Sequence, residues 1–214
     1  MLPRLYAIVD CDIARANGWT VPALARACFD GGARLVQVRA KTLAAGELLD
    51  VCEQVAADAT SCGATIVVND RADVARLVSG AGVHVGQDDL PPALARAVVG
   101  PNAIVGFSTH TVAQVDAALG EPISYLAVGP VFGTRTKETG YDAVGLDLVR
   151  YAAGAVARGR PQAAPTPVVA IGGITLDRAR SVIDSGAASV AVISDLFTTG
   201  DPAARVAEFV HVLG

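Results

Sequence analysis

The sequence predicts a (β/α)8 TIM barrel, a closed ring of parallel strands surrounded by helices. Eight short apolar runs recur along the 214 residues, helix-like stretches separate them, and most of the runs end in polar residues. Strands that alternate with helices favour a parallel sheet, and eight such units close into a barrel with its active site at the carboxyl ends of the strands. We therefore expect one catalytic domain over residues 1–214, with the polar ends of the runs gathered at one mouth.

The expected strands are rich in Val, Ile and Ala without polar alternation, which is typical of parallel strands buried on both faces. They are Leu5–Asp10, Leu35–Lys41, Thr65–Asp70, Gly82–Asp89, Ile104–Thr109, Tyr125–Phe132, Pro167–Gly173 and Ser189–Ser194. The expected helices are Val21–Asp30, Ala45–Ser61, Arg71–Val78, Pro92–Val99, Thr111–Leu119, Asp147–Ala157, Asp177–Ser185 and Ala203–Val212. Glycines follow many of these helices, as expected where a helix ends.

Composition narrows the class of protein. With 52% apolar and 18% charged residues, the chain can bury a large core, and its net charge of −4 argues against a nucleic-acid partner. The cysteines, at positions 11, 28, 52 and 62, form no C-x-x-C pair and are expected to be reduced packing residues. No signal peptide or membrane-spanning run is evident, so we expect a cytoplasmic protein without a membrane partner. The oligomeric state stays open, a homo-oligomer included.

A cationic group ends the second expected strand. Gln37, Arg39 and Lys41 occupy alternate positions, so all three point the same way for as long as the strand lasts. An amide, a guanidinium and an ammonium aimed into a barrel mouth would hold an anion well. The alternative is a set of surface charges at the start of a loop.

Carboxylates follow the third and fourth expected strands. Asn69 and Asp70 end one strand, and Asp88 and Asp89 follow the next. Two carboxylates without a His or Cys partner set suggest a hard ion such as Mg²⁺, which usually keeps waters and bridges to phosphate oxygens. The alternative is that Asp70 and Asp89 are helix N-caps, a position that favours Asp.

A long loop, Gly133–Gly145, follows the sixth expected strand, and loops of this length over a barrel mouth are often lids. Its polar residues are Thr134, Arg135, Thr136 and Lys137, followed by Gly140. Hydroxyls and a lysine beside glycines suit contact with phosphate or diphosphate. The alternative is an exposed polar loop without a ligand.

A second anion site is expected at the seventh and eighth strands. Gly172 and Gly173 follow one strand and Ser194 the other, where barrels commonly bind phosphate through backbone N–H groups and a helix N-terminus. The mouth would thus hold two anions. The cationic, metal-assisted site suits a diphosphate leaving group, and the neutral, backbone-based site suits a monophosphate.

The histidines and Ser108 give weaker signals. Ser108 and His110 follow the fifth expected strand, but no third, orienting acid is evident, so we favour substrate binding over a covalent serine. His84 lies within the fourth expected strand between two valines and is interpreted as structural. His211 falls in the last expected helix and is expected at the surface. The sequence leaves the role of His110 open.

Taken together, these segments resemble the thiamine phosphate synthase family. The matching segments, in the family's order, are LYAIVD, QVRAK, VNDRADVA, HVGQDDLP, GFSTHT, GPVFGTRTK, AIGGI and VAVIS. They span nearly the whole chain, and together they are far more specific than any one of them. The resemblance implies a transferase that joins a hydroxymethylpyrimidine diphosphate to a thiazole phosphate, with or without a carboxylate on the thiazole, and releases diphosphate.

The resemblance also implies roles for individual residues. The pyrimidine diphosphate would be bound by Gln37, Arg39, Lys41, Asn69, Ser108 and Lys137. The thiazole phosphate would be bound by Thr134, Arg135, Thr136, Gly173, Ile193 and Ser194. Asp70 and Asp89 would hold Mg²⁺, with Asp89 preferred over Asp88. Arg39, Lys41 and Lys137 would stabilise the leaving diphosphate, and the pyrimidine amino group would let the C–O bond break before the thiazole attacks.

Three other functions remain possible readings of the same barrel. A thiazole phosphate tautomerase would keep the monophosphate site and a histidine after the fifth strand, but would not need Asp70, Asp89 and Lys137. A non-catalytic ligand-binding barrel would be expected to lose a charged member of the site, and none is missing. A Schiff-base aldolase would use Lys41 or Lys137, yet neither lies in an apolar strand that would lower its pKa.

Overall fold

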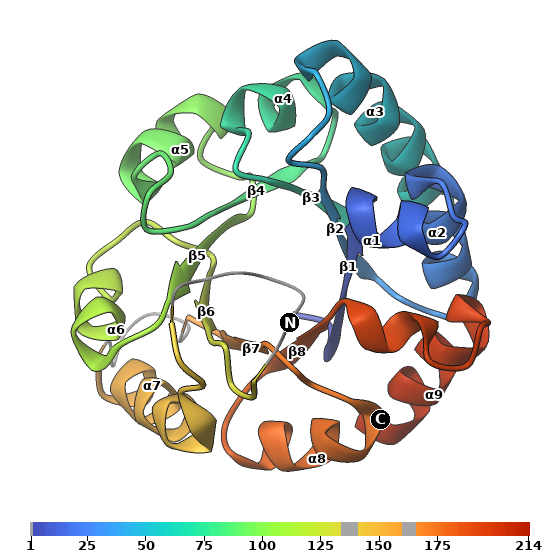
Figure 1. Ribbon diagram of the computed structural model, residues 1–214. Helices are drawn as coiled ribbons and strands as arrows, with labels where there is room; N and C mark the ends of the chain where they lie inside the picture. Colours follow the sequence, from blue (N-terminus) through green and yellow to red (C-terminus); the bar gives the residue numbers. More distant parts are fainter. Residues whose placement is uncertain (1, 134–140, 160–165) are drawn as a thin grey trace.

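The computed structural model describes residues 2–133, 141–159 and 166–214 and confirms the predicted barrel. Eight parallel strands pair in chain order, and β8 closes the ring against β1 (Figure 1). The strands are β1 Leu5–Asp10, β2 Leu35–Arg39, β3 Thr65–Asn69, β4 Gly82–Val85, β5 Val105–Thr109, β6 Tyr125–Val128, β7 Val168–Ile171 and β8 Ser189–Val192.

Helices form the outer layer around this ring, as Figure 1 shows. They are α1 Cys11–Ala16, α2 Val21–Asp30, α3 Ala45–Ser61, α4 Ala72–Leu77, α5 Pro92–Val99, α6 Val112–Ala118, α7 Gly145–Gly159, α8 Leu176–Asp184 and α9 Pro202–Leu213, with a 3₁₀ turn, η1, at Ser194–Phe197. None of the helices in the described ranges combines the length and the apolar character needed to cross a lipid bilayer.

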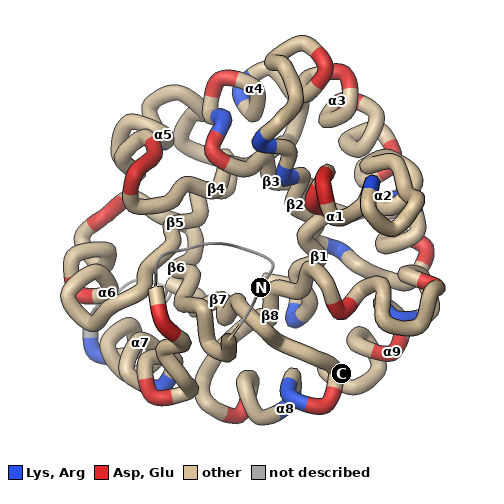
Figure 2. Tube along the Cα trace, in the orientation of Figure 1, with Lys and Arg blue, Asp and Glu red and all other residues tan. Residues whose placement is uncertain are grey.

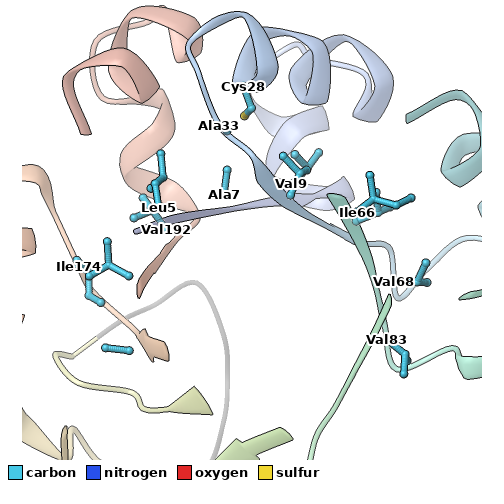
Figure 3. Close-up of a cluster of buried hydrophobic side chains, with 14 of the residues drawn as sticks. Leu5, Ala7, Val9, Cys28, Ala33, Ile66, Val68, Val83, Ile174 and Val192 are labelled. Carbon is cyan, nitrogen blue, oxygen red and sulfur yellow. The ribbon is translucent and has the colours of Figure 1, made fainter. Parts of the chain in front are cut away.

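Both faces of the strands are buried, because each strand packs helices on one side and the barrel interior on the other. On β1, Ala7 and Val9 join the large cluster beneath the helices, whereas Tyr6 and Ile8 join a smaller cluster inside the barrel. In Figure 3, Cys28 of α2 points towards β1 above Ala7. This two-sided burial explains why the strands read as continuous apolar runs.

The cysteines are free thiols, as predicted, and three of them are buried. Burial raises the pKa of Cys28 and of Cys52 to about 12. Both thiols therefore stay protonated at neutral pH and behave as small apolar groups in the core.

The predicted elements differ from the observed ones mainly at their ends. The fourth strand ends at Val85 rather than Asp89, because the residues after it turn back, with the amide of Asp89 bonded to the carbonyl of Gly86. The sixth ends at Val128, where the Gly129–Pro130 sequence follows. The sequence reading also missed α1 and η1, which are each less than two full turns long.

Candidate active site

A buried ion pair lies where β1 and β2 end. The guanidinium of Arg39 donates from Nη1 to the carboxylate of Asp10, whose other oxygen accepts from the amides of Asp12 and Ile13 and caps α1. Asp10 is only 4% exposed, and Nε of Arg39 is buried without a hydrogen-bond partner. Asp10 therefore fixes the predicted anion-binding guanidinium in place, and the sequence reading did not include it in the site.

A second cation, Lys41, lies beyond the end of β2. The strand ends at Arg39, so strand alternation aligns Gln37 with Arg39 and does not extend to Lys41. The ammonium of Lys41 lies 3.5 Å from a carboxylate oxygen of Asp70. In Figure 2, basic segments lie next to acidic ones near the ends of β2 and β3. The predicted anion site is thus built from cations that are paired with carboxylates.

Asp70 and Asp89 each form a hydrogen bond with β4 or with the turn that follows it. The amide of Asp70 donates to the carbonyl of His84, and a carboxylate oxygen of Asp89 accepts from the amide of Gly86, each at 2.8 Å. Asp70 has a φ of 63°, in the left-handed region that few residues other than glycine adopt, and such strain is common at functional sites.

Neither aspartate caps a helix. The N-cap of α4 is Arg71 and that of α5 is Pro91, and neither end has a side-chain capping bond. Within the described ranges no cluster of three or more His, Cys, Asp or Glu side chains could hold a metal. Two carboxylates fit an ion that keeps waters and shares phosphate oxygens, which is the habit of Mg²⁺.

A chain of hydrogen bonds crosses the barrel interior beneath this mouth. Nε2 of Gln37 donates to the hydroxyl of Tyr6 at 2.8 Å, and the hydroxyls of Tyr6 and Tyr125 lie 3.0 Å apart. The Tyr125 hydroxyl lies 2.8 Å from Nδ1 of His84, whose Nε2 lies 2.8 Å from Oγ of Ser108. The chain thus links Gln37 and Ser108, two residues expected to bind the pyrimidine diphosphate.

The interior is shaped to hold this chain. Tyr6 and Tyr125 are 1% and 0% exposed, and their rings meet edge to face at 5.8 Å between centroids, while the His84 ring stacks on Tyr125. A Cβ at Gly106 would lie 2.1 Å from the Tyr125 ring, so only glycine leaves room there. Burial raises the pKa of both phenols well above the usual value, so both keep their protons.

The histidine that contacts Ser108 is His84 rather than His110. Nδ1 of His110 lies 2.6 Å from the carbonyl oxygen of Gly129, and its ring stacks on Tyr141 with centroids 4.0 Å apart. His84 lies within β4, as predicted, and its two partners come from β5 and β6.

Asn69 and His211 lie as the sequence suggested. Asn69 is the last residue of β3 and is 6% exposed. It pairs in register with His84 of the neighbouring strand β4. His211 is exposed on α9.

The turn after β7 is made by two glycines with positive φ. Gly172 has a φ of 103° and Gly173 one of 61°. A Cβ on Gly172 would lie 2.6 Å from Pro130, and one on Gly173 would lie 2.7 Å from the carbonyl oxygen of Gly133. The backbone therefore packs against the segment after β6 so closely that no side chain fits on these two glycines. A guanidinium adjoins the turn, because Nη1 of Arg178 donates to the Gly173 carbonyl at 3.3 Å.

Ser194 lies at the start of η1, exposed, directly after Ile193. The helix that begins at this point is a short 3₁₀ turn, so the expected helix N-terminus is that of η1. The next residue, Asp195, is 7% exposed and accepts from Nε and Nη2 of Arg205 at 3.0 and 2.7 Å and from the amide of Leu176. This ion pair fastens the Ser194 segment to α8 and α9.

Part of the predicted site lies outside the described residues. These positions are Thr134, Arg135, Thr136, Lys137 and Gly140. The described part of the Gly133–Gly145 loop returns to the barrel, because the amides of Val144 and Gly145 donate to the carbonyls of Pro130 and Val131. The lid and the phosphate contacts expected of this loop stay predictions.

Comparison with known proteins identifies the family. The model of the family described as thiamine monophosphate synthase matches residues 5–196. The chain belongs to this family. A thiamine-phosphate synthase from Koribacter versatilis is 44% identical over 214 residues, covering 99% of this chain and 96% of the relative. One from Acidothermus cellulolyticus is 42% identical, covering 96% and 92%. The family predicted from the sequence is thereby confirmed.

Solved structures agree with the fold. A thiamine phosphate pyrophosphorylase from Pyrococcus furiosus superposes with a TM-score of 0.83 at 28% identity, covering 98% of this chain and 95% of that one. A mutant tryptophan synthase α-subunit from the same organism has a TM-score of 0.65 at 13% identity, covering 98% and 97%, and shows the fold alone.

Proposed function

We propose that this chain makes thiamine phosphate by joining a pyrimidine diphosphate to a thiazole phosphate and releasing diphosphate. The observation that carries the proposal is the set of charges at the ends of β1–β4. Two cations, Arg39 and Lys41, and two carboxylates, Asp70 and Asp89, stand at neighbouring strand ends of one barrel mouth. Family membership supports the same reaction.

The cationic side would receive the leaving diphosphate. Arg39 is held by Asp10 and is 14% exposed at its side chain, so its charge is partly shielded from water and acts strongly on a bound anion. Lys41, 56% exposed, can turn from Asp70 towards a phosphate oxygen. Lys137 would join them from the loop. A fixed guanidinium and a movable ammonium suit a group whose charge grows as the C–O bond breaks.

Asp70 and Asp89 are the residues that would hold Mg²⁺. When bound, the ion would neutralise charge on the diphosphate oxygens. The donor set fits, because the two hard carboxylates follow neighbouring strands, β3 and β4, and Mg²⁺ takes its remaining ligands from water and phosphate oxygens. Asp89 also bonds its own loop through Gly86, so its carboxylate is held in place before any ion arrives.

The neutral side would receive the monophosphate of the thiazole. Gly173 offers backbone N–H groups on a turn that admits no side chain, and Ser194 offers a hydroxyl from a segment fixed by Asp195. Thr134, Arg135 and Thr136 would close over this side. With both phosphates held at one mouth, the thiazole nitrogen needs only orientation, because its lone pair requires no base.

The pyrimidine amino group can donate electrons to the ring and thereby stabilise a cation, so the C–O bond would break before the thiazole attacks. The residues around the reacting carbon support this route. Ser108 shares its hydroxyl with His84, whose other nitrogen contacts Tyr125 rather than an orienting carboxylate, so the serine is poorly activated as a nucleophile. Lys41 is exposed and paired, which disfavours a Schiff base.

The proposal is tested by assaying the purified protein with both substrates and Mg²⁺. Asp70→Asn and Asp89→Asn keep the size of the side chain. At position 89, Asn can still accept the hydrogen bond from the Gly86 amide. We expect each to lower turnover by about 100-fold at millimolar Mg²⁺, since each removes a metal-binding charge. The measurement is diphosphate release as a function of Mg²⁺ concentration.

Asp88→Asn is the matched control, because Asp88 is exposed, adjacent to Asp89 and not expected to bind the ion. Its turnover should stay within twofold of the parent. Full turnover of the parent protein in EDTA would overturn the metal assignment. Absence of thiamine phosphate under all conditions would overturn the function itself.

A further inference from the structure

We propose that the buried chain from Gln37 to Ser108 has a fixed direction, so that the Ser108 hydroxyl always presents its hydrogen to the pyrimidine diphosphate. Tyr6, Tyr125 and His84 would then be positioning residues, which act on the substrate through Ser108. This inference rests on the proposed function and adds to it the means by which the pyrimidine side is oriented.

The direction follows from the donor at one end of the chain. Nε2 of Gln37 is an amide nitrogen that can donate a hydrogen bond but cannot accept one, so it donates to the Tyr6 hydroxyl. If Tyr6 also accepted from Tyr125, its own hydrogen would be buried without an acceptor among the described residues, which is costly, so Tyr6 gives its hydrogen to Tyr125. Tyr125 in turn gives its own to Nδ1 of His84. His84 then carries its hydrogen on Nε2 and donates to Ser108.

The position of Ser108 turns this direction into recognition. Its Oγ accepts from His84, so its own hydrogen is left for an acceptor on the mouth side, and Ser108 is only half-buried. The opposite direction would put the His84 hydrogen on Nδ1 and make Ser108 donate to Nε2. Ser108 could then only accept a hydrogen bond from the substrate. Diphosphate oxygens and unprotonated ring nitrogens have no hydrogen to donate, so Ser108 could not bind them.

Burial makes the direction durable. The phenols of Tyr6 and Tyr125 are almost wholly excluded from water and keep their protons, so each can accept one bond and donate one. Gly106 leaves the space that Tyr125 fills, and the His84 ring lies flat against Tyr125. Hydrogen bonds in such a chain polarise one another, and a bond from a pre-oriented donor costs little reorganisation when the substrate binds.

The first test reads the direction without substrate. The protein has three histidines, and NMR of ¹⁵N-labelled protein reports which ring nitrogen of each histidine carries hydrogen. The His84 signal is assigned by its loss in His84→Gln. We expect the Nε2–H form for His84 in the parent protein and a mixture of both forms in Tyr125→Phe. The Nδ1–H form in the parent would overturn the proposal.

The second test reads the effect on the substrate. Tyr125→Phe should lower kcat/KM for the pyrimidine diphosphate by about 10-fold, because Ser108 loses its preset direction. The KM for the thiazole phosphate should change less than twofold. Tyr6→Phe should have a smaller effect, since the bonds from Tyr125 to His84 and Ser108 remain. Equal effects on both substrates would indicate general damage to the barrel and overturn a role in positioning.

A double variant separates action through Ser108 from other effects. If the chain acts through that hydroxyl, Tyr125→Phe should cost nothing further in a Ser108→Ala background. Losses that simply multiply would overturn the proposal. Tyr151→Phe is the matched control, because it removes a phenol that bonds Asp116 on the outside of the barrel, and its kinetics should match the parent. If the parent makes no thiamine phosphate, the proposed function fails, and the NMR test still decides the direction.

Discussion

The two halves of the barrel mouth present different chemical groups. At the ends of β1–β4, charged side chains face one another in pairs, Arg39 with Asp10 and Lys41 with Asp70. At the ends of β7 and β8, a Gly-Gly turn and Ser194 present backbone and hydroxyl groups. The difference matches the charge of the two proposed ligands, because a departing diphosphate needs more compensation than a monophosphate that does not react.

The two halves also differ in what holds them. In the charged half, Arg39 and Lys41 are themselves partners in ion pairs, so support and binding use the same side chains. In the neutral half, the supporting pair of Asp195 and Arg205 is largely buried beside Ser194, and neither residue is a proposed ligand-binding residue. A change in the first half should therefore alter stability and affinity together, whereas a change in the second should separate them.

The largest expected effect comes from Arg39→Ala. It removes a fixed charge from the diphosphate side, and we expect inhibition by diphosphate to weaken by about 100-fold with thiazole phosphate binding little changed. It also leaves the buried Asp10 unpaired, which should lower the free energy of unfolding by about 3 kcal/mol. Ligand titration and urea unfolding measure the two effects.

Adding Asp10→Asn separates the two effects. Asn can still cap α1 but carries no charge, so the double variant Asp10→Asn/Arg39→Ala should regain stability without regaining diphosphate affinity. Recovery of affinity in the double variant would show that Arg39 acts by neutralising Asp10 rather than by binding the anion.

Gly173→Ala is the corresponding change in the neutral half. The new methyl group would meet the carbonyl of Gly133, and a φ of 61° is unfavourable for alanine. We expect the KM for thiazole phosphate to rise by about 10-fold because the turn must move, with diphosphate inhibition unchanged. Gly63→Ala is the control, since Gly63 has a φ of 68° with open space around it. It should cost about 1 kcal/mol of stability and leave both ligands unaffected.

Much of this architecture could be predicted from the sequence, because buried parallel strands and polar strand ends are local signals. The bounds of β1, α2, α3 and α5 match the prediction residue for residue. Short elements were missed, since α1 depends on a single capping residue, Asp10, that reads equally well as the end of a strand. The predicted fourth and sixth strands were also too long, because residues 86–89 and 129–132 lie beyond the ends of β4 and β6.

The partners of the site residues could not be predicted in the same way. Alternation places Gln37 and His84 inside the barrel, but their contacts with Tyr6 and Tyr125 depend on the register of strands far apart in the sequence. For the same reason Ser108 was set beside its sequence neighbour His110, whereas it contacts His84. Sequence patterns predict which way a side chain points, and the closed barrel decides what it meets.

The smallest expected effect tests whether support and binding are separate in the neutral half. Arg205→Lys keeps the positive charge but loses the two-pronged contact with Asp195, so η1 should be held less firmly. We expect the KM for thiazole phosphate to rise about threefold with kcat and diphosphate inhibition unchanged, because Ser194 shifts while the charged half stays intact. Glu208→Gln is the control, since Glu208 pairs with the outer side of the same guanidinium without touching Asp195. Equal effects of the two changes on the thiazole phosphate would mean that the surface charge near α9, rather than the buried contact behind Ser194, sets the affinity of this half.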